Sequence, residues 1–131
     1  MAENIRYGHY NELATAGVAY LTGKISRGLF EETINRILVF VRDGKRQFQA
    51  IQLPPELKKI FQEDMEKARK GFWLFEQGIE KMRKAVDEER KKEEVLWQGI
   101  GLVKFGCDLL NEVMIHYEKL FGNGDEGEHE E

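Results

Sequence analysis

Residues 71–121 read GFWLFEQGIEKMRKAVDEERKKEEVLWQGIGLVKFGCDLLNEVMIHYEKLF. This stretch decides the fold of the chain. It contains no proline, and its apolar residues follow the heptad spacing of helices that bury a common seam. When heptad position a is set at Phe72 and position d at Phe75, thirteen of the fifteen a and d positions through residue 121 are apolar or aromatic. The pattern predicts an all-α protein. We expect a helical bundle of about four helices with a long C-terminal helical hairpin, or one very long helix, in heptad register.

The two polar positions of the seam, Glu89 and Glu93, both fall in the charged octet DEERKKEE at residues 87–94. This octet is either the tip of a helical hairpin or an exposed stretch of one continuous helix. A continuous helix of about 65 residues would be about 100 Å long and would need partners along its seam. A hairpin is the commoner arrangement in a small domain, but no Gly or Pro marks a helix end here. The sequence leaves both alternatives open.

Local signals divide the rest of the chain into two short helices and one long helical region. Ser26 is a good N-cap, and Gly23 suits the end of the helix before it. Pro54 and Pro55 form a firm boundary, because the residue before a proline avoids the helical region and a proline fits the first helical turn. The expected helical ranges are 10–22, 27–52 and 55–121.

The weakest part of this assignment is residues 37–53. Asp43-Gly44 is a strong signal for a tight hairpin turn, so a β-hairpin is the alternative there. The residues after the turn alternate poorly between apolar and polar, which favours a helix that runs through Gly44.

The chain length, 131 residues, corresponds to one domain. Residues 1–121 are predicted to form a single helical domain. Residues 122–131 contain five acidic residues, three glycines and no Lys or Arg, a composition typical of a disordered acidic tail.

The charge balance argues against nucleic acid as a partner. The chain has 20 basic and 24 acidic residues, and removing the five acids of the tail leaves 20 and 19. A nearly neutral body lacks the basic face that phosphate binding needs. The richest basic patch, Arg42, Lys45 and Arg46 around Asp43, is more typical of a solvated turn than of a phosphate site.

Cysteine content and hydropathy set the expected location. Cys107 is the one cysteine, so no intramolecular disulfide can form. The first residues contain no apolar signal region, and no run of about 20 apolar residues exists. We expect a cytoplasmic protein that does not insert into a membrane.

The residues available for catalysis or metal binding are few, and we expect no enzyme activity, no cofactor and no metal. Ser26 is better explained as a helix cap, and Cys107 occupies a seam position away from the face of His116. A di-iron bundle needs Glu-x-x-His motifs, which the helical part lacks. Glu112 and His116, four residues apart, could bind a metal ion, but such pairs are more often surface contacts.

Four glycines share heptad position g: Gly71, Gly78, Gly99 and Gly106. A glycine inside a helix costs about 1 kcal/mol relative to alanine, so a common register needs a reason. Close packing of another helix backbone is the favoured interpretation, and room for a ligand is the alternative.

A second apolar row accompanies the seam, and its members are candidate protein-interface residues: Trp73, Trp97, Leu102, Phe105 and Leu109. The row either lies inside the bundle or pairs with another molecule. Because the two short helices cannot cover the long ones, we expect a homodimer. The predicted function is a non-enzymatic interaction or scaffold protein that self-associates through its long helices. An adaptor or secretion-type chaperone that binds an amphipathic segment of a partner is the alternative, and metal or small-ligand binding in the bundle is less favoured.

Overall fold

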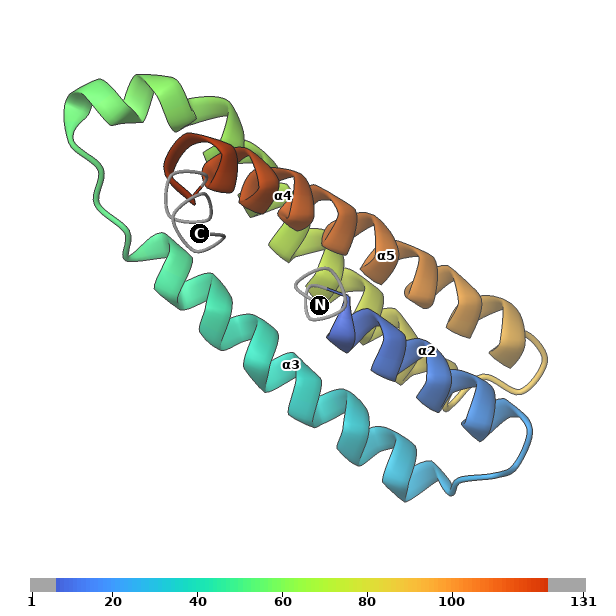
Figure 1. Cartoon of the computed structure of the whole chain (residues 1–131). Helices are drawn as coiled ribbons and strands as arrows, with labels where there is room; N and C mark the ends of the chain where they lie inside the picture. Colours follow the sequence, from blue (N-terminus) through green and yellow to red (C-terminus); the bar gives the residue numbers. More distant parts are fainter. Residues whose placement is uncertain (1–6, 123–131) are drawn as a thin grey trace, which may run out of the picture.

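The computed structural model describes residues 7–122, which form four α-helices and a short π-helical turn. The helices are α2 (Gly8–Leu21), α3 (Arg27–Gln49), α4 (Pro55–Ala85) and α5 (Lys92–Tyr117), and the turn is η1 (Glu118–Gly122). Successive helices run in opposite directions, and none of the described residues forms a strand (Figure 1). The predicted all-α bundle of four helices is therefore confirmed. The predicted acidic tail lies outside the described residues, apart from Gly122.

The helix boundaries follow the local signals of the sequence. The Ser26 hydroxyl accepts a hydrogen bond from the backbone N–H of Leu29 at 3.1 Å and caps α3. Gly23 has a φ of +77°, a left-handed conformation that glycine adopts without strain, directly after α2. Pro54 is the N-cap of α4, and Pro55 is its first residue.

Both open alternatives are resolved in favour of helices joined by short connections. α3 continues through Gly44 to Gln49, so residues 37–53 contain no β-hairpin and the basic patch is helical rather than a turn. The Asp43 carboxylate accepts hydrogen bonds from Arg46 and Gln47, one helical turn later. The long region is a hairpin, because α4 ends at Ala85 and α5 begins at Lys92.

The helices differ in length, and this difference determines the shape of the bundle. At 1.5 Å per residue, α4 and α5 are about 46 and 39 Å long, whereas α3 is about 34 Å and α2 only about 21 Å. α2 packs between α3 and α5, diagonally across from α4. It covers only the half of the bundle near the α4–α5 connection, as Figure 1 shows.

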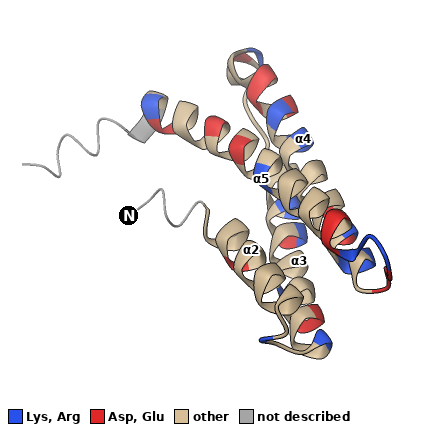
Figure 2. Cartoon of the chain, turned by 90° about the vertical axis from the view of Figure 1, so that its right-hand side faces the viewer, with Lys and Arg blue, Asp and Glu red and all other residues tan. Residues whose placement is uncertain are grey.

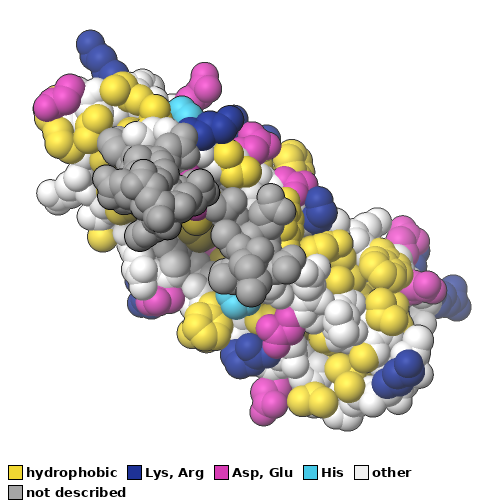
Figure 3. Space-filling model, in the orientation of Figure 1, with side chains coloured by type: hydrophobic (Ala, Val, Ile, Leu, Met, Phe, Trp, Pro, Cys, Tyr) yellow, Lys and Arg dark blue, Asp and Glu magenta, His cyan; other side chains and the backbone are white. Residues whose placement is uncertain are grey.

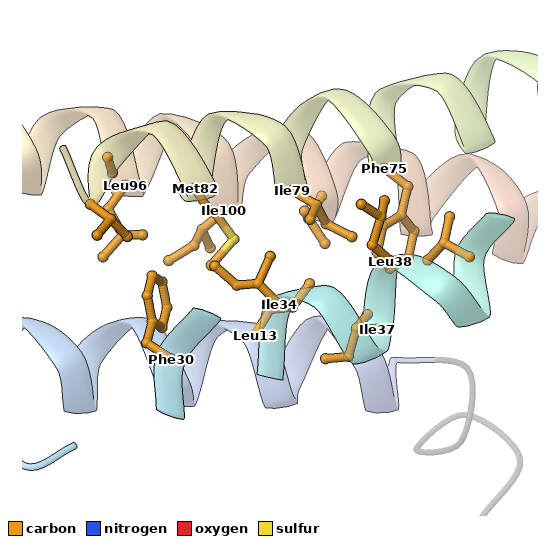
Figure 4. Packing of buried hydrophobic residues seen from close by; sticks show 14 of the residues in the cluster. Leu13, Phe30, Ile34, Ile37, Leu38, Phe75, Ile79, Met82, Leu96 and Ile100 are labelled. Atoms are coloured by element: carbon orange, nitrogen blue, oxygen red, sulfur yellow. The ribbon is translucent and has the colours of Figure 1, made fainter. Parts of the chain in front are cut away.

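The half with four helices contains most of the hydrophobic core. Side chains from all four helices meet between them (Figure 4). The largest fully buried ones are Leu13, Phe30, Ile34, Ile37, Ile79, Met82, Leu96 and Val103. In the other half, the described residues contribute three helices, α3, α4 and α5, and no fourth. We call this half the open end.

Charged side chains of both signs are interspersed along the helices (Figure 2). The predicted basic patch faces acids of α4: Arg42 contacts Glu76 at 3.2 Å and Glu80 at 3.4 Å, and Lys45 contacts Glu76 at 2.9 Å. These pairs tie α3 to α4. Over residues 7–122, no helix combines the length and the apolar character needed to cross a bilayer.

Candidate functional site

The four glycines of the heptad register lie where α4 and α5 come closest. Gly78 faces Gly99, and Gly71 faces Gly106. A Cβ atom placed on Gly78 would lie 2.5 Å from the carbonyl oxygen of Gly99, and one on Gly99 would lie 2.6 Å from that of Gly78. These are distances that a real Cβ does not reach, so the two backbones are in direct contact. The space beside the glycines is filled by the partner helix and leaves no room for a ligand.

The predicted interface residues divide into exposed and partly buried side chains. Trp73 on α4 is 56% exposed, and Trp97 and Phe105 on α5 are 44% and 47% exposed. Leu102 and Leu109 are partly buried. α5 therefore has an outward apolar face and is not buried all round. The Lys70 ammonium lies 5.6 Å from the centre of the Phe105 ring, in a cation–π contact between α4 and α5.

Trp97, Gly101 and Phe105 follow one another at intervals of four residues, so they share the outward face of α5. We call them the aromatic stripe. Gly101 differs from the four packed glycines, because a Cβ placed on it would meet no atom within 4 Å. The surface at Gly101 is therefore open within the described chain. Sequence reasoning did not single out Gly101, since the fifth glycine of this region lies outside the common register.

The open end contains a cleft with a volume of about 410 Å³. It lies between the end of α3, the linker to α4, the first turns of α4 and the end of α5. Figure 3 shows hydrophobic side chains at this end of the molecule. The lining residues are Phe48, Ile51 and Leu53 from α3 and the linker, Phe61, Asp64 and Met65 from α4, and Val113, Met114, Tyr117 and Glu118 from α5 and η1.

Asp64 is the buried carboxylate of this cleft, with only 7% of the residue exposed. Its Oδ2 atom forms a hydrogen bond with Nδ1 of His116. The ring of Phe61 lies 6.0 Å from that of His116 and 6.3 Å from that of Tyr117. Sequence analysis missed Asp64, although a signal exists. Asp64 lies seven residues before Gly71, so it occupies the same heptad position as the glycines that face α5.

The possible metal pair, Glu112 and His116, has other partners. Glu112 contacts the Lys67 ammonium at 3.0 Å, and His116 contacts Asp64. Across residues 7–122, no group of three or more His, Cys, Asp or Glu side chains is arranged to hold a metal ion. Glu112 and His116 are thus used to join α4 to α5.

Tyr7 fixes the start of α2 to the middle of α5. Its hydroxyl donates a hydrogen bond of 2.6 Å to Asp108, which also accepts one of 3.0 Å from Lys104. Partial burial works to raise the pKa of Asp108, but the hydrogen bonds from Tyr7 and Lys104 outweigh it and lower the pKa below its ordinary value. The same bond to Asp108 raises the pKa of Tyr7. This cluster joins the beginning of α2 to α5.

Cys107 lies inside the core and is only 3% exposed. Burial raises the pKa of its thiol to about 12, with a smaller contribution from the Asp108 charge. The thiol is therefore protonated at neutral pH, and a nucleophilic thiolate does not form in the folded chain.

Comparisons of the chain with protein families, curated proteins and solved structures gave no significant match.

Proposed function

We propose that this chain is a non-enzymatic helical interaction protein that self-associates into a homodimer through the outer face of α5. The observation that carries the proposal is the aromatic stripe. Two large rings are about half exposed, and between them lies a glycine whose Cβ position is empty. A glycine there costs about 1 kcal/mol of helix stability, and no contact within the described chain compensates for it. A second molecule packed on the stripe would compensate for this cost.

The spacing of the stripe suits a twofold axis. Trp97 and Phe105 each lie four residues from Gly101, on opposite sides of it. If two α5 helices pack antiparallel with the axis at Gly101, the glycines face each other and each Trp97 faces Phe105 of the second copy. Such an interface uses the same patch on both molecules, as twofold dimers do. The gap at Gly101 lets the two backbones approach closely.

The energetics favour a dimer of modest affinity. Full burial of an aromatic side chain is worth about 1.5–3 kcal/mol, so burying the exposed halves of four rings gives about 4 kcal/mol. Association costs at least about 4 kcal/mol in lost freedom of motion, so further apolar contacts are required. Leu102 and Leu109 lie three and four residues from Phe105 and supply them. The dimer is therefore to be sought at high micromolar concentration.

Light scattering coupled to size exclusion tests the proposal. We expect the wild-type chain at high micromolar concentration to have the mass of a dimer. Gly101→Glu puts a charge at the twofold axis, and Phe105→Glu removes a ring, so each should give a folded monomer. Gly28→Glu is the matched control: Gly28 is also an exposed helical glycine, but on α3, and a Cβ placed on it would meet only the Ser26 hydroxyl oxygen, at an ordinary distance of 3.9 Å. This control should stay dimeric, and circular dichroism should show the same helicity in all four proteins.

Two results would reject self-association through the stripe: a wild-type chain that is monomeric at this concentration, or a Gly101→Glu variant that remains dimeric. A monomeric wild-type chain would shift the proposal to the adaptor alternative. One observation favours that alternative, namely the exposed apolar side chains around the open end: Ile51, Ile60, Met114, Ile115 and Leu120.

A further inference from the structure

The cleft at the open end has the size and lining of a small-molecule site. Its volume, about 410 Å³, lies in the range of about 300–1,000 Å³ that is usual for ligand pockets. It is formed by three helices and the linker, at the opposite end of the bundle from the α4–α5 connection. No residue of the aromatic stripe lines it. A binding activity of this cleft would be separate from self-association and would not depend on it.

The lining is mainly apolar and aromatic, and its charged side chains are acidic. Phe48, Phe61 and Tyr117 contribute three aromatic rings, and aliphatic side chains fill most of the remaining wall. The two carboxylate side chains of the lining are Asp64 and Glu118. Among the described residues, no Lys or Arg lines this cleft. A ligand that matches these walls has an apolar body and a positive charge.

Asp64 is the residue beside which the positive charge of such a ligand would lie. Its carboxylate is buried in the wall, and the hydrogen bond to His116 uses the Oδ2 atom alone. A carboxylate in an apolar wall is poorly hydrated, so a cation that reaches it restores the interactions that burial has removed. The faces of nearby aromatic rings attract a cation as well.

We propose that the cleft binds a small apolar amine. The ammonium group of the ligand lies beside Asp64, and its hydrocarbon part packs against Leu53, Met65 and Val113. A neutral molecule of the same shape retains the apolar contacts but lacks the charge interaction. A carboxylate of similar shape is repelled by Asp64 and Glu118. The charge of the ligand head group, more than its shape, decides binding.

Isothermal titration calorimetry with three probes of similar size tests this: 2-phenylethylamine, 2-phenylethanol and 3-phenylpropanoate. We expect the amine to bind the full chain at least tenfold more tightly than either of the others. Asp64→Asn should lower amine affinity to that of the alcohol and leave the alcohol unchanged. Since this substitution also alters the contact with His116, His116→Gln is the matched control. It retains the Asp64 carboxylate and should retain the preference for the amine.

Val113→Trp, which fills the cleft, should abolish binding of all three probes while circular dichroism shows an unchanged fold. The proposal is overturned if the folded wild-type chain binds none of the probes, if it binds alcohol and amine equally, or if Asp64→Asn keeps the preference. Gly101→Glu separates this proposal from self-association. A monomeric Gly101→Glu variant should bind the amine like the wild-type chain, and loss of binding in that folded variant would contradict a site that is independent of the stripe.

Discussion

At the scale of single residues, the paired glycines define how closely α4 and α5 approach. We expect Gly78→Ala and Gly99→Ala each to destabilise the protein. Alanine would gain about 1 kcal/mol in helix propensity, but its methyl group would lie about 2.5 Å from a backbone oxygen that cannot rotate away. Overpacking of this kind typically costs 1–3 kcal/mol, so the net loss should be of the order of 1 kcal/mol. Urea unfolding followed by circular dichroism measures it.

Gly44→Ala is the control for this prediction. Gly44 also lies inside a helix, but a Cβ placed there would lie 3.6 Å from the ring of Phe72, an ordinary contact. This variant should be more stable than the wild-type chain by up to about 1 kcal/mol. If Gly99→Ala were stabilising to the same extent, the two backbones would not be in contact at Gly99.

At the scale of helices, the contribution of the α3 cap to the free energy of unfolding can be measured on its own. Ser26→Ala removes the hydroxyl that accepts a hydrogen bond from Leu29, and should lower the free energy of unfolding by about 1 kcal/mol. Ser26→Asp keeps an acceptor and should stay close to the wild-type value. An unchanged Ser26→Ala variant would mean that water satisfies the end of α3 equally well. Thermal and urea unfolding of the three proteins make the comparison.

Helix boundaries could be predicted from the sequence because their causes are local. Ser26, Gly23 and the Pro54-Pro55 pair act on the residues next to them. The break after Ala85 could not be predicted, since every residue of the octet is a tolerable helix former. Contacts between distant parts of the chain are made there: Val86 is buried in the core, and Arg27 of α3 contacts Asp87 at 2.9 Å.

The difference between local signals and long-range contacts also separates the glycine register from the cleft. The glycine register indicated a close helix contact, because a seven-residue spacing is visible in the sequence. It could not say which glycine faces which. The cleft could not be predicted at all, because its walls come from α3, the linker, α4 and α5, which are far apart in the sequence. Asp64 of α4 is buried where it contacts His116 of α5, 52 residues further along the chain.

At the scale of the whole molecule, the bundle consists of a well-covered half and an open half. In the first, four helices share one core. In the second, three helices surround a cleft lined by apolar side chains. The tight α4–α5 contact spans both halves, since Gly78 and Gly99 lie in one and Gly71 and Gly106 lie nearer the other.

Cys107 reports on the packing of this core, because burial makes its thiol harder to ionise in the folded chain than in the unfolded one. Its ordinary pKa is 9.0, and burial raises it to about 12 in the folded chain. Above pH 9 the unfolded chain releases a proton that the folded chain retains, so the stabilisation is present below pH 9 and is lost as the pH rises toward 12.

We therefore expect the wild-type chain to lose stability between pH 8 and pH 10 more steeply than Cys107→Ala, by about 1.4 kcal/mol over that interval. Urea unfolding under reducing conditions measures both proteins at each pH. Tyr7 and Lys104 also titrate in the alkaline range, but they are present in both proteins, so their contributions cancel to first order in the difference. The loss of one sulfur atom lowers the stability of the variant at every pH and does not affect the slope. Parallel pH profiles would show that the thiol ionises in the folded chain as freely as in the unfolded one, and a core closed around α5 at Cys107 would then be excluded.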